Sequence, residues 1–108
     1  MAEHVTFWRM KALPGRSEEL AALMRDDQGE PDRLRDAGWI ATVVGSRKDD
    51  PDELWGTVVW DTSDRYYANA DSPEQDAWYS KARALLAADP DWYDCDLVDD
   101  QRAGASPS

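Results

Sequence analysis

The feature that most constrains the fold of this chain is a pair of neighbouring segments with β-type composition. Residues 39–45 and 54–60 are rich in Val, Trp and Thr, and a polar loop that contains Pro51 separates them. This pattern predicts a β-hairpin. Both predicted strands are largely apolar on each of their two faces, so both faces of the sheet need a cover. By alternation, the first of these strands carries Ile40, Thr42 and Val44 on one face and Trp39, Ala41 and Val43 on the other. The second carries Leu54, Val58 and Trp60 on one face and Trp55, Thr57 and Val59 on the other.

The residues before the hairpin predict one strand and a helical region. A first strand over residues 5–12 ends at the Pro-Gly pair that follows it. Gly29 and Pro31 interrupt the helical region, and a short turn around Leu34 precedes the hairpin. Ser17 can cap the helix, whose apolar residues have helical spacing at positions Leu20, Leu23 and Met24.

The residues after the hairpin predict a second helical region in two parts. Residues 63–69 open it. Ser72 and Gln75 then have the spacing of a capping box, and Pro73 falls at the first helical position, where its missing N–H costs nothing. The buried stripe predicted for this last helix consists of Trp78, Ala82, Leu85 and Leu86.

The element order predicts the fold class. Asp89-Pro90 ends the last helix, and residues 92–98 form a fourth strand. The order is therefore βαββαβ, which is typical of a ferredoxin-like α+β fold with an antiparallel sheet. We expect a single domain over residues 1–100 and a disordered tail over 101–108.

Coverage of the sheet predicts self-association. Two helical regions of this length can cover only one face of the sheet. The second apolar face is most simply covered by another copy of the chain. We therefore expect a homodimer in which two sheets pack face to face.

Composition excludes several classes of function. The chain of 108 residues has 23 acidic and 12 basic residues and a net charge of −11, a field that repels nucleic acid and anionic lipid. Cys95 and His4 are each the only residue of their type, which excludes an internal disulfide, a cysteine zinc cluster and a multi-histidine metal site. No apolar stretch has the length of a membrane span or the character of a signal peptide, so the cytoplasm is the expected location.

The stretch from Trp60 to Tyr66 predicts the position of a ligand site. Trp60 ends the third strand, a helix-starting Asp-Thr-Ser-Asp cluster follows at once, and Tyr66 lies one turn into the helix. The end of a strand and the start of a helix together place these two aromatic side chains at the mouth of one pocket.

Four segments, taken in order and at their spacings, resemble the antibiotic-biosynthesis-monooxygenase-like (ABM) family of dimeric α/β barrels. The resemblance extends from Val5 to Val98. Members include cofactor-independent monooxygenases that oxidise phenols to quinones and haem-degrading enzymes, and the latter need a histidine that the last helix lacks. The segments are Leu13-Pro14-Gly15-Arg16, Gly38-Trp39, Val59-Trp60-Asp61-Thr62 and the helical run at 79–86.

The resemblance implies a set of site residues. In quinone-forming members the pocket is lined by an Asn on the third strand, a Trp at the end of that strand and a Tyr six residues later. Trp60 and Tyr66 match the last two and become the candidate catalytic residues, whereas the Asn position falls on Gly56. No cofactor and no metal are implied.

Further residues are candidates for substrate binding. Trp8, Gly56, Tyr67, Asn69 and Trp78 are expected around the pocket, although each tryptophan can equally fill the core. Gly56 can leave room for a ligand ring or admit a helix side chain. Two other predictions are structural: Cys95 alternates with Tyr93 and Leu97 as a buried thiol, and His4 lies on a frayed strand start that makes a role as general base improbable.

Three functions are consistent with these residues. The first is a cofactor-independent monooxygenase that acts on a small phenol-like or anthrone-like aromatic, and it lacks an evident general base. The second is a non-catalytic dimer that binds a small hydrophobic molecule. The third is a purely structural dimer whose indoles fill the core. A cavity of several hundred Å³ with converging polar groups favours the first two.

Overall fold

The computed structural model describes residues 3–26 and 31–101. Its strands and helical regions follow one another along the chain in the predicted order. The predicted tail beyond Gln101 and the break at Gly29 lie outside these residues. Each helical region is divided into two helices. The elements are β1 (His4–Lys11), α1 (Ser17–Asp26), α2 (Pro31–Ala37), β2 (Trp39–Ser46), β3 (Glu53–Trp60), α3 (Ser63–Ala70), α4 (Pro73–Arg83) and β4 (Asp91–Asp96).

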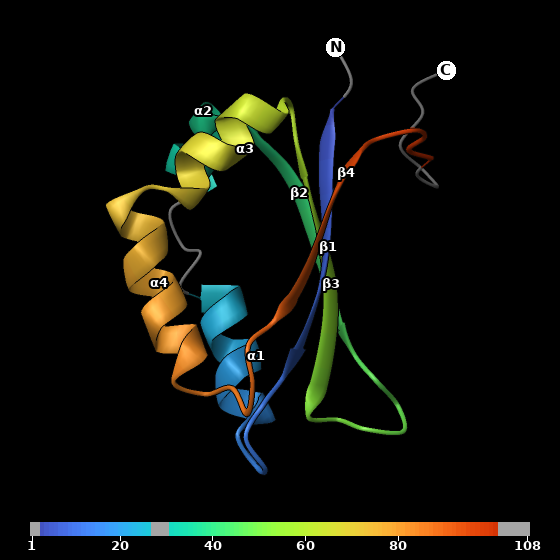
Figure 1. Ribbon diagram of the computed structural model, residues 1–108, viewed down its shortest axis with the longest axis vertical. Coiled ribbons are helices and arrows are strands. Elements are labelled where there is room, and N and C mark those ends of the chain that lie inside the picture. The colour runs from blue at the N-terminus through green and yellow to red at the C-terminus, as the bar shows by residue number, and fades with distance from the viewer. Residues whose placement is uncertain (1–2, 27–30, 102–108) are drawn as a thin grey trace.

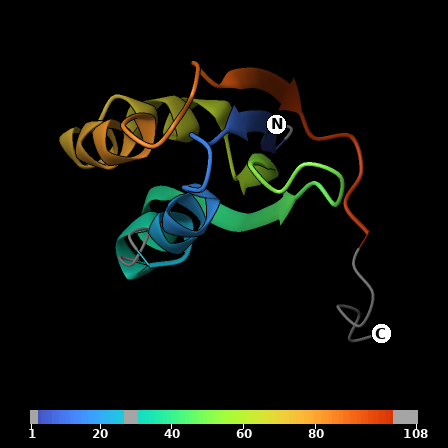
Figure 2. The same cartoon turned by 90° about the horizontal axis from the view of Figure 1, so that it is seen from below.

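The four strands form one antiparallel sheet, and the helices lie on one side of it. The strand order is β2-β3-β1-β4, and all three neighbouring pairs are antiparallel. Seen along the strands, α1 with α2 and α3 with α4 form two groups over the same face (Figures 1 and 2). The predicted ferredoxin-like α+β fold is confirmed.

Side-chain caps set the starts of α3 and α4. The hydroxyl of Thr62 accepts a hydrogen bond from the Arg65 backbone N–H at 3.2 Å. The hydroxyl of Ser72 accepts one from the Gln75 backbone N–H at 3.1 Å, and Pro73 occupies the first turn of α4. Each cap contributes about 1 kcal/mol. The predicted starts of α3 and α4 are therefore confirmed.

The end of α4 differs from the prediction. The helix ends at Arg83, before the predicted end at Asp89-Pro90, and the chain tightens through a hydrogen bond from the Leu86 N–H to the Arg83 carbonyl. This turn allows Leu86 to pair with Ala12 just beyond the end of β1. Pairing with the strand therefore takes precedence over a further helical turn.

The alternation predicted for β2 is wrong at its first residues. A β-bulge shifts the register against β3 between Trp39 and Ala41. A bulge inserts one extra residue and reverses the face of what precedes it. The indole of Trp39 therefore faces the helices together with Thr42 and Val44, on the face that the prediction gave to Ile40.

Two predictions about burial are also wrong. Cys95 is exposed, because the side of β4 that faces the helices carries Trp92 and Asp94 instead. His4 is only 2% exposed and lies within β1. The strand start does not fray, because the ring of Tyr66 from α3 stacks on the imidazole at 4.2 Å.

One end of the space between sheet and helices is densely filled. The side chains there are 0–4% exposed, as expected of an interior packed at crystal-like density. This filled end consists of Met10, Ala12, Leu20, Leu54, Ala82 and Leu86.

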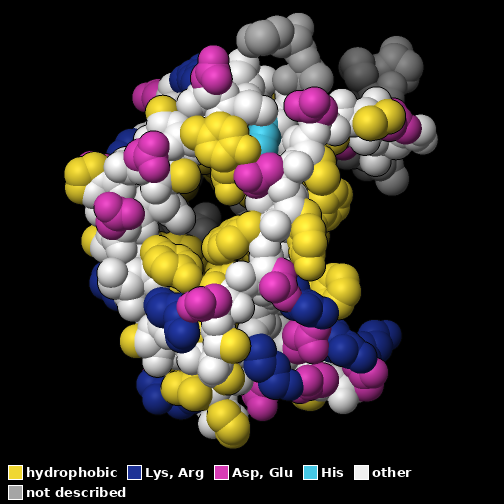
Figure 3. Space-filling view, viewed as in Figure 1, with side chains coloured by type: hydrophobic (Ala, Val, Ile, Leu, Met, Phe, Trp, Pro, Cys, Tyr) yellow, Lys and Arg dark blue, Asp and Glu magenta, His cyan; other side chains and the backbone are white. Residues whose placement is uncertain are grey.

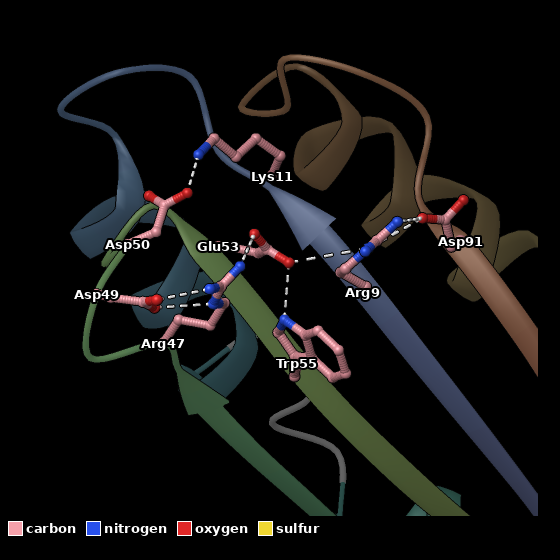
Figure 4. A network of polar contacts seen from close by, with 8 residues as sticks. All are labelled: Arg9, Lys11, Arg47, Asp49, Asp50, Glu53, Trp55 and Asp91. Atoms are coloured by element: carbon pink, nitrogen blue, oxygen red, sulfur yellow. Dashed lines mark hydrogen bonds and ion pairs between the residues drawn. The ribbon is translucent and has the colours of Figure 1, made fainter.

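The face of the sheet away from the helices is apolar and open. Phe7, Val43, Trp55 and Tyr93 lie on it and are 48–66% exposed. The hairpin end of this face carries ion pairs (Figure 4).

Glu53 is the centre of this charged group. It accepts hydrogen bonds from Arg47 at 3.1 Å and from the indole N–H of Trp55 at 2.8 Å, and Arg9 reaches it at 3.8 Å. Arg9 also pairs with Asp91 at 2.6 Å. The outer face therefore combines apolar side chains with charges that are already paired within the chain.

Candidate functional site

A cavity of about 430 Å³ lies between the sheet and the helices. The hollow is visible from the side, with hydrophobic side chains around it (Figure 3). Its volume is that of a typical small-molecule site, so the indoles do not fill this space. The lining residues include five of the six tryptophans, namely Trp8, Trp39, Trp60, Trp78 and Trp92, together with Tyr66, Tyr67, Asn69, Asp76, Tyr79 and Asp94.

Trp60 and Tyr66 meet at one wall of the cavity, as their spacing predicts. Trp60 is 2% exposed, and its ring lies edge-on to that of Tyr66 with centroids 6.0 Å apart. Burial raises the pKa of the Tyr66 hydroxyl above its ordinary value. Tyr66 is therefore a neutral phenol at physiological pH, able to donate a hydrogen bond to a ligand.

A polar network connects buried His4 with the cavity. The imidazole Nε2 lies 2.6 Å from the Thr6 hydroxyl, and that hydroxyl donates to Asp94 Oδ1 at 2.7 Å. The Tyr67 hydroxyl donates to the other oxygen, Asp94 Oδ2, at 2.8 Å. This hydrogen bond raises the pKa of Tyr67. Asp94 lines the cavity, so the network ends in a carboxylate that a ligand can reach.

The hydrogen positions in this network follow from the donor count. Thr6 has one hydroxyl proton, which it gives to Asp94, so it accepts the proton of His4 Nε2. In neutral His4 the Nδ1 atom is then an acceptor, and the Ser63 hydroxyl at 2.9 Å is its donor. The four side chains from β1, α3 and β4 form one chain of hydrogen bonds in which every donor points toward Asp94.

Asn69 presents an amide to the same cavity. Its side-chain oxygen accepts a hydrogen bond of 3.5 Å from Arg33, which is not a lining residue. An arginine is only a donor, so the amide nitrogen of Asn69 is the group left for a ligand. The cavity thus has one N–H donor that can stabilise a developing negative charge on a bound oxygen.

Solved structures are similar to this chain in fold, whereas no family model matches its sequence and no curated protein does. A protein from Chloroflexus aurantiacus J-10-fl, named provisionally as an antibiotic biosynthesis monooxygenase, is 25% identical with a TM-score of 0.76, over 95% of this chain and 100% of the other. The chain has the fold of the antibiotic biosynthesis monooxygenases. The resemblance stated from the sequence is confirmed at this level.

Two further structures with the ABM fold extend the comparison. SnoaB from Streptomyces nogalater, a cofactor-independent oxygenase, is 14% identical with a TM-score of 0.76, over 96% of this chain and 99% of its own. A protein from Bordetella bronchiseptica with the same provisional name is 18% identical with a TM-score of 0.76, over 91% and 99%. At these identities the likeness concerns the fold.

Within this ABM fold, most residues predicted to bind substrate line the cavity. Trp8, Tyr67, Asn69 and Trp78 do so with Trp60 and Tyr66, whereas Gly56 is not a lining residue. A Cβ atom at Gly56 would lie 2.1 Å from Cζ2 of Trp8, its partner across the strands. The space that Gly56 leaves is therefore taken by the Trp8 indole, and not by a ligand or a helix side chain.

Several lining residues were absent from the sequence-based set, among them Trp39, Trp92 and Asp94. The bulge that turns Trp39 inward leaves no mark that a single sequence shows. On β4 the alternation of Trp92 and Asp94 with Tyr93 and Cys95 is visible in the sequence. The prediction, however, placed the more apolar pair, Tyr93 and Cys95, in the interior. Asp94 supplies the carboxylate that the sequence analysis did not find.

The described residues show two further absences. No group of three or more His, Cys, Asp or Glu side chains among them is arranged to hold a metal ion. No helix within residues 3–26 and 31–101 is long and apolar enough to cross a membrane.

Proposed function

We propose that this chain is a cofactor-independent monooxygenase that acts on a small hydroxylated aromatic compound of the phenol or anthrone type. The observation that carries the proposal is the cavity, in which aromatic walls surround a carboxylate, a neutral phenol and an amide. Such a substrate is itself the reductant of oxygen: a ring CH₂ and O₂ give a ring carbonyl and water. The protein must remove a proton, hold the resulting anion and exclude water.

Each role has a candidate side chain in the cavity. Asp94 accepts the phenolic proton, and the hydroxyls of Thr6 and Tyr67 hold its carboxylate in place. Tyr66 and the Asn69 amide donate hydrogen bonds to the substrate oxygen. Trp60 forms a flat wall against the ring.

The test is oxygen consumption by the purified protein with a panel of hydroquinones and anthrones, without added flavin or metal. We expect uptake that falls at least about tenfold in Tyr66→Phe and in Trp60→Phe, the scale of a lost catalytic hydrogen bond or wall. Trp55→Phe is the matched control, because this indole lies on the same strand but on the outer face. A flat trace across the panel, or an equal loss in the control, would contradict the proposal.

A non-catalytic ligand-binding domain is the second candidate, and Gly56 favours it. The resemblance places an Asn at that position, and this chain has neither the amide nor the space for one there. Binding of the panel compounds without oxygen uptake is the result that this candidate predicts.

We also propose that the chain forms a homodimer through the outer face of its sheet. The exposed apolar side chains Phe7, Val43 and Tyr93 support this, because isolated domains rarely leave such a face open. Analytical ultracentrifugation at micromolar concentration should give a dimer, and Val43→Lys should shift it toward monomer. Lys48→Glu, a change in the hairpin loop, is the control. A monomeric parent protein would end the proposal.

A further inference from the structure

The charges around the cavity are of one sign. Asp76 and Asp94 line it, and none of the lining residues in the described chain is a Lys, Arg or His. Asp94 is held by the hydroxyls of Thr6 and Tyr67, with His4 Nε2 at 3.8 Å. A ligand entering the cavity therefore meets negative charge that no lining cation balances.

The uncharged aromatic part of the lining also attracts cationic ligands. The faces of indole and phenol rings carry negative potential and bind cations, tryptophan most strongly. Five indoles and three phenols surround this cavity. Two basic side chains that contact the walls are not themselves lining residues: Arg33 donates to the Asn69 oxygen, and His4 stacks on Tyr66.

From this geometry we infer that the cavity selects aromatic ligands that carry a cationic nitrogen and rejects aromatic carboxylates. The nitrogen lies between the Asp94 carboxylate and the indole faces, and the ring system packs against Trp60 and Trp8. A volume of about 430 Å³ accommodates at least two fused rings with a short side chain.

This selectivity defines the substrate class of the proposed function. It rests on that function only for the effect of charge on proton removal. Transfer of a phenolic proton from a neutral substrate to Asp94 would leave a net anion beside the Asp76 carboxylate. The same step on an aminated phenol creates a zwitterion with no net charge. An acidic cavity can therefore hold the reactive form of a cationic substrate more readily than that of a neutral one.

Calorimetric titration with three probes of matched size tests the inference without turnover. The probes are naphthylmethylamine, which is a cation at neutral pH, naphthylmethanol, which is neutral, and naphthylacetate, which is an anion. We expect the amine to bind at least about tenfold more tightly than the alcohol, and the acetate at least about tenfold more weakly. Equal binding of the three probes, tightest binding of the acetate, or no binding of any probe would overturn the inference.

Variants locate the selectivity in the cavity. Asp94→Asn should reduce the preference for the amine over the alcohol at least about fivefold, and Asp76→Asn should reduce it less. Asp49→Asn removes the same charge from the hairpin loop and should leave the preference unchanged. Circular dichroism checks that each variant folds, and Asp76, on the surface of α4, gives a second reading if Asp94→Asn does not fold. An equal effect in Asp49→Asn, or full preference in both cavity variants, would assign the selectivity to the overall charge and contradict the inference.

The two proposals fail separately. Selective amine binding with no oxygen uptake would retain the charge selectivity and remove the oxygenase. Oxygen uptake with neutral phenols, together with equal binding of the three probes, would retain the oxygenase and remove the charge selectivity.

Discussion

The two ends of the interface between sheet and helices share β1, β3, α1 and α4 but are packed in opposite ways. At the filled end, helices α1 and α4 contact the sheet through aliphatic side chains that leave no room. At the other end, larger side chains surround a cavity of about 430 Å³. Side-chain volume alone therefore does not determine whether an interface is filled. Large rigid rings that are held at their edges by hydrogen bonds and by one another keep a space open, whereas small flexible side chains pack into it.

The hollow end is held open by polar contacts. The imidazole of His4 is fixed by Ser63 on one nitrogen and Thr6 on the other, and it supports the ring of Tyr66. The Trp39 indole N–H donates to Thr42 at 2.8 Å. These contacts orient the rings, so the walls are rigid where a ligand would need them preorganised.

The largest expected effect is a difference in unfolding free energy between two substitutions on one helix, one at each end of the interface. Leu20 and Met24 lie one turn apart on α1, but Leu20 is completely buried in the filled end and Met24 lines the cavity. Leu20→Ala should lower the free energy of unfolding by about 2–5 kcal/mol, because it leaves a void among packed neighbours. Met24→Ala should cost less than half as much. Urea denaturation measures both, and similar losses would show that the two ends are packed alike.

A smaller effect on unfolding free energy should follow from a substitution that pushes a ring into the cavity at the hollow end. In Gly56→Ala the new methyl group collides with the Trp8 ring, which must move toward the cavity. We expect a loss of about 1–3 kcal/mol in unfolding free energy and weaker binding of the naphthyl probes. A second change, Trp8→Leu, should restore part of the stability. Gly45→Ala, a strand glycine with open space around it, is the control. An unchanged Gly56→Ala protein would argue against this packing.

The polar contacts of the hollow end are tested by His4→Phe. The aromatic ring can still stack on Tyr66, but Thr6 and Ser63 lose their hydrogen-bond partner. The expected cost is about 1–2 kcal/mol of unfolding free energy. Oxygen uptake should also fall, because Thr6 loses the donor that orients its hydroxyl toward Asp94. Thermal unfolding and the oxygen electrode give the two values. Full activity in a folded variant would show that His4 does not position Asp94.

The smallest expected effect is the dependence of stability on alkaline pH. Burial raises the pKa of Tyr66 above the ordinary value of 10.0, so the unfolded chain ionises first as the pH rises. The stability that Tyr66 contributes is therefore present below pH 10 and is lost as the pH passes through the higher pKa of the folded state. Tyr66→Phe should make the fall in unfolding free energy above about pH 10 less steep. Tyr93→Phe, on the outer face, is the control, and identical slopes in the three proteins would contradict the expectation.

The fold was predictable because its signals are local. Thr62, Ser72 and Pro73 mark helix starts by their own hydrogen-bonding chemistry, and the two apolar strands mark the hairpin. Trp60 and Tyr66 were found for the same reason, since a strand end and a helix start fix their relation within seven residues.

The rest of the site depends on contacts between distant segments. Asp94 becomes a site residue because β4 pairs beside β1 and brings it to Thr6. On β4 the apolar residues Tyr93 and Cys95 face outward, so the usual inference from hydrophobic alternation fails where the inner face surrounds a polar cavity and the outer face is the apolar one. The burial of His4 likewise depends on α3, which begins 59 residues later at Ser63.

The contact between Trp8 and Gly56 also limits how this site can change in evolution. The two residues face each other across β1 and β3, and the ring of one occupies the volume that a side chain on the other would need. A lineage cannot gain an amide at position 56 while it keeps an indole at position 8. Equally, it cannot gain an indole at position 8 while position 56 carries an amide side chain. Among related sequences the two positions should therefore co-vary, with a small residue at one wherever the other is large.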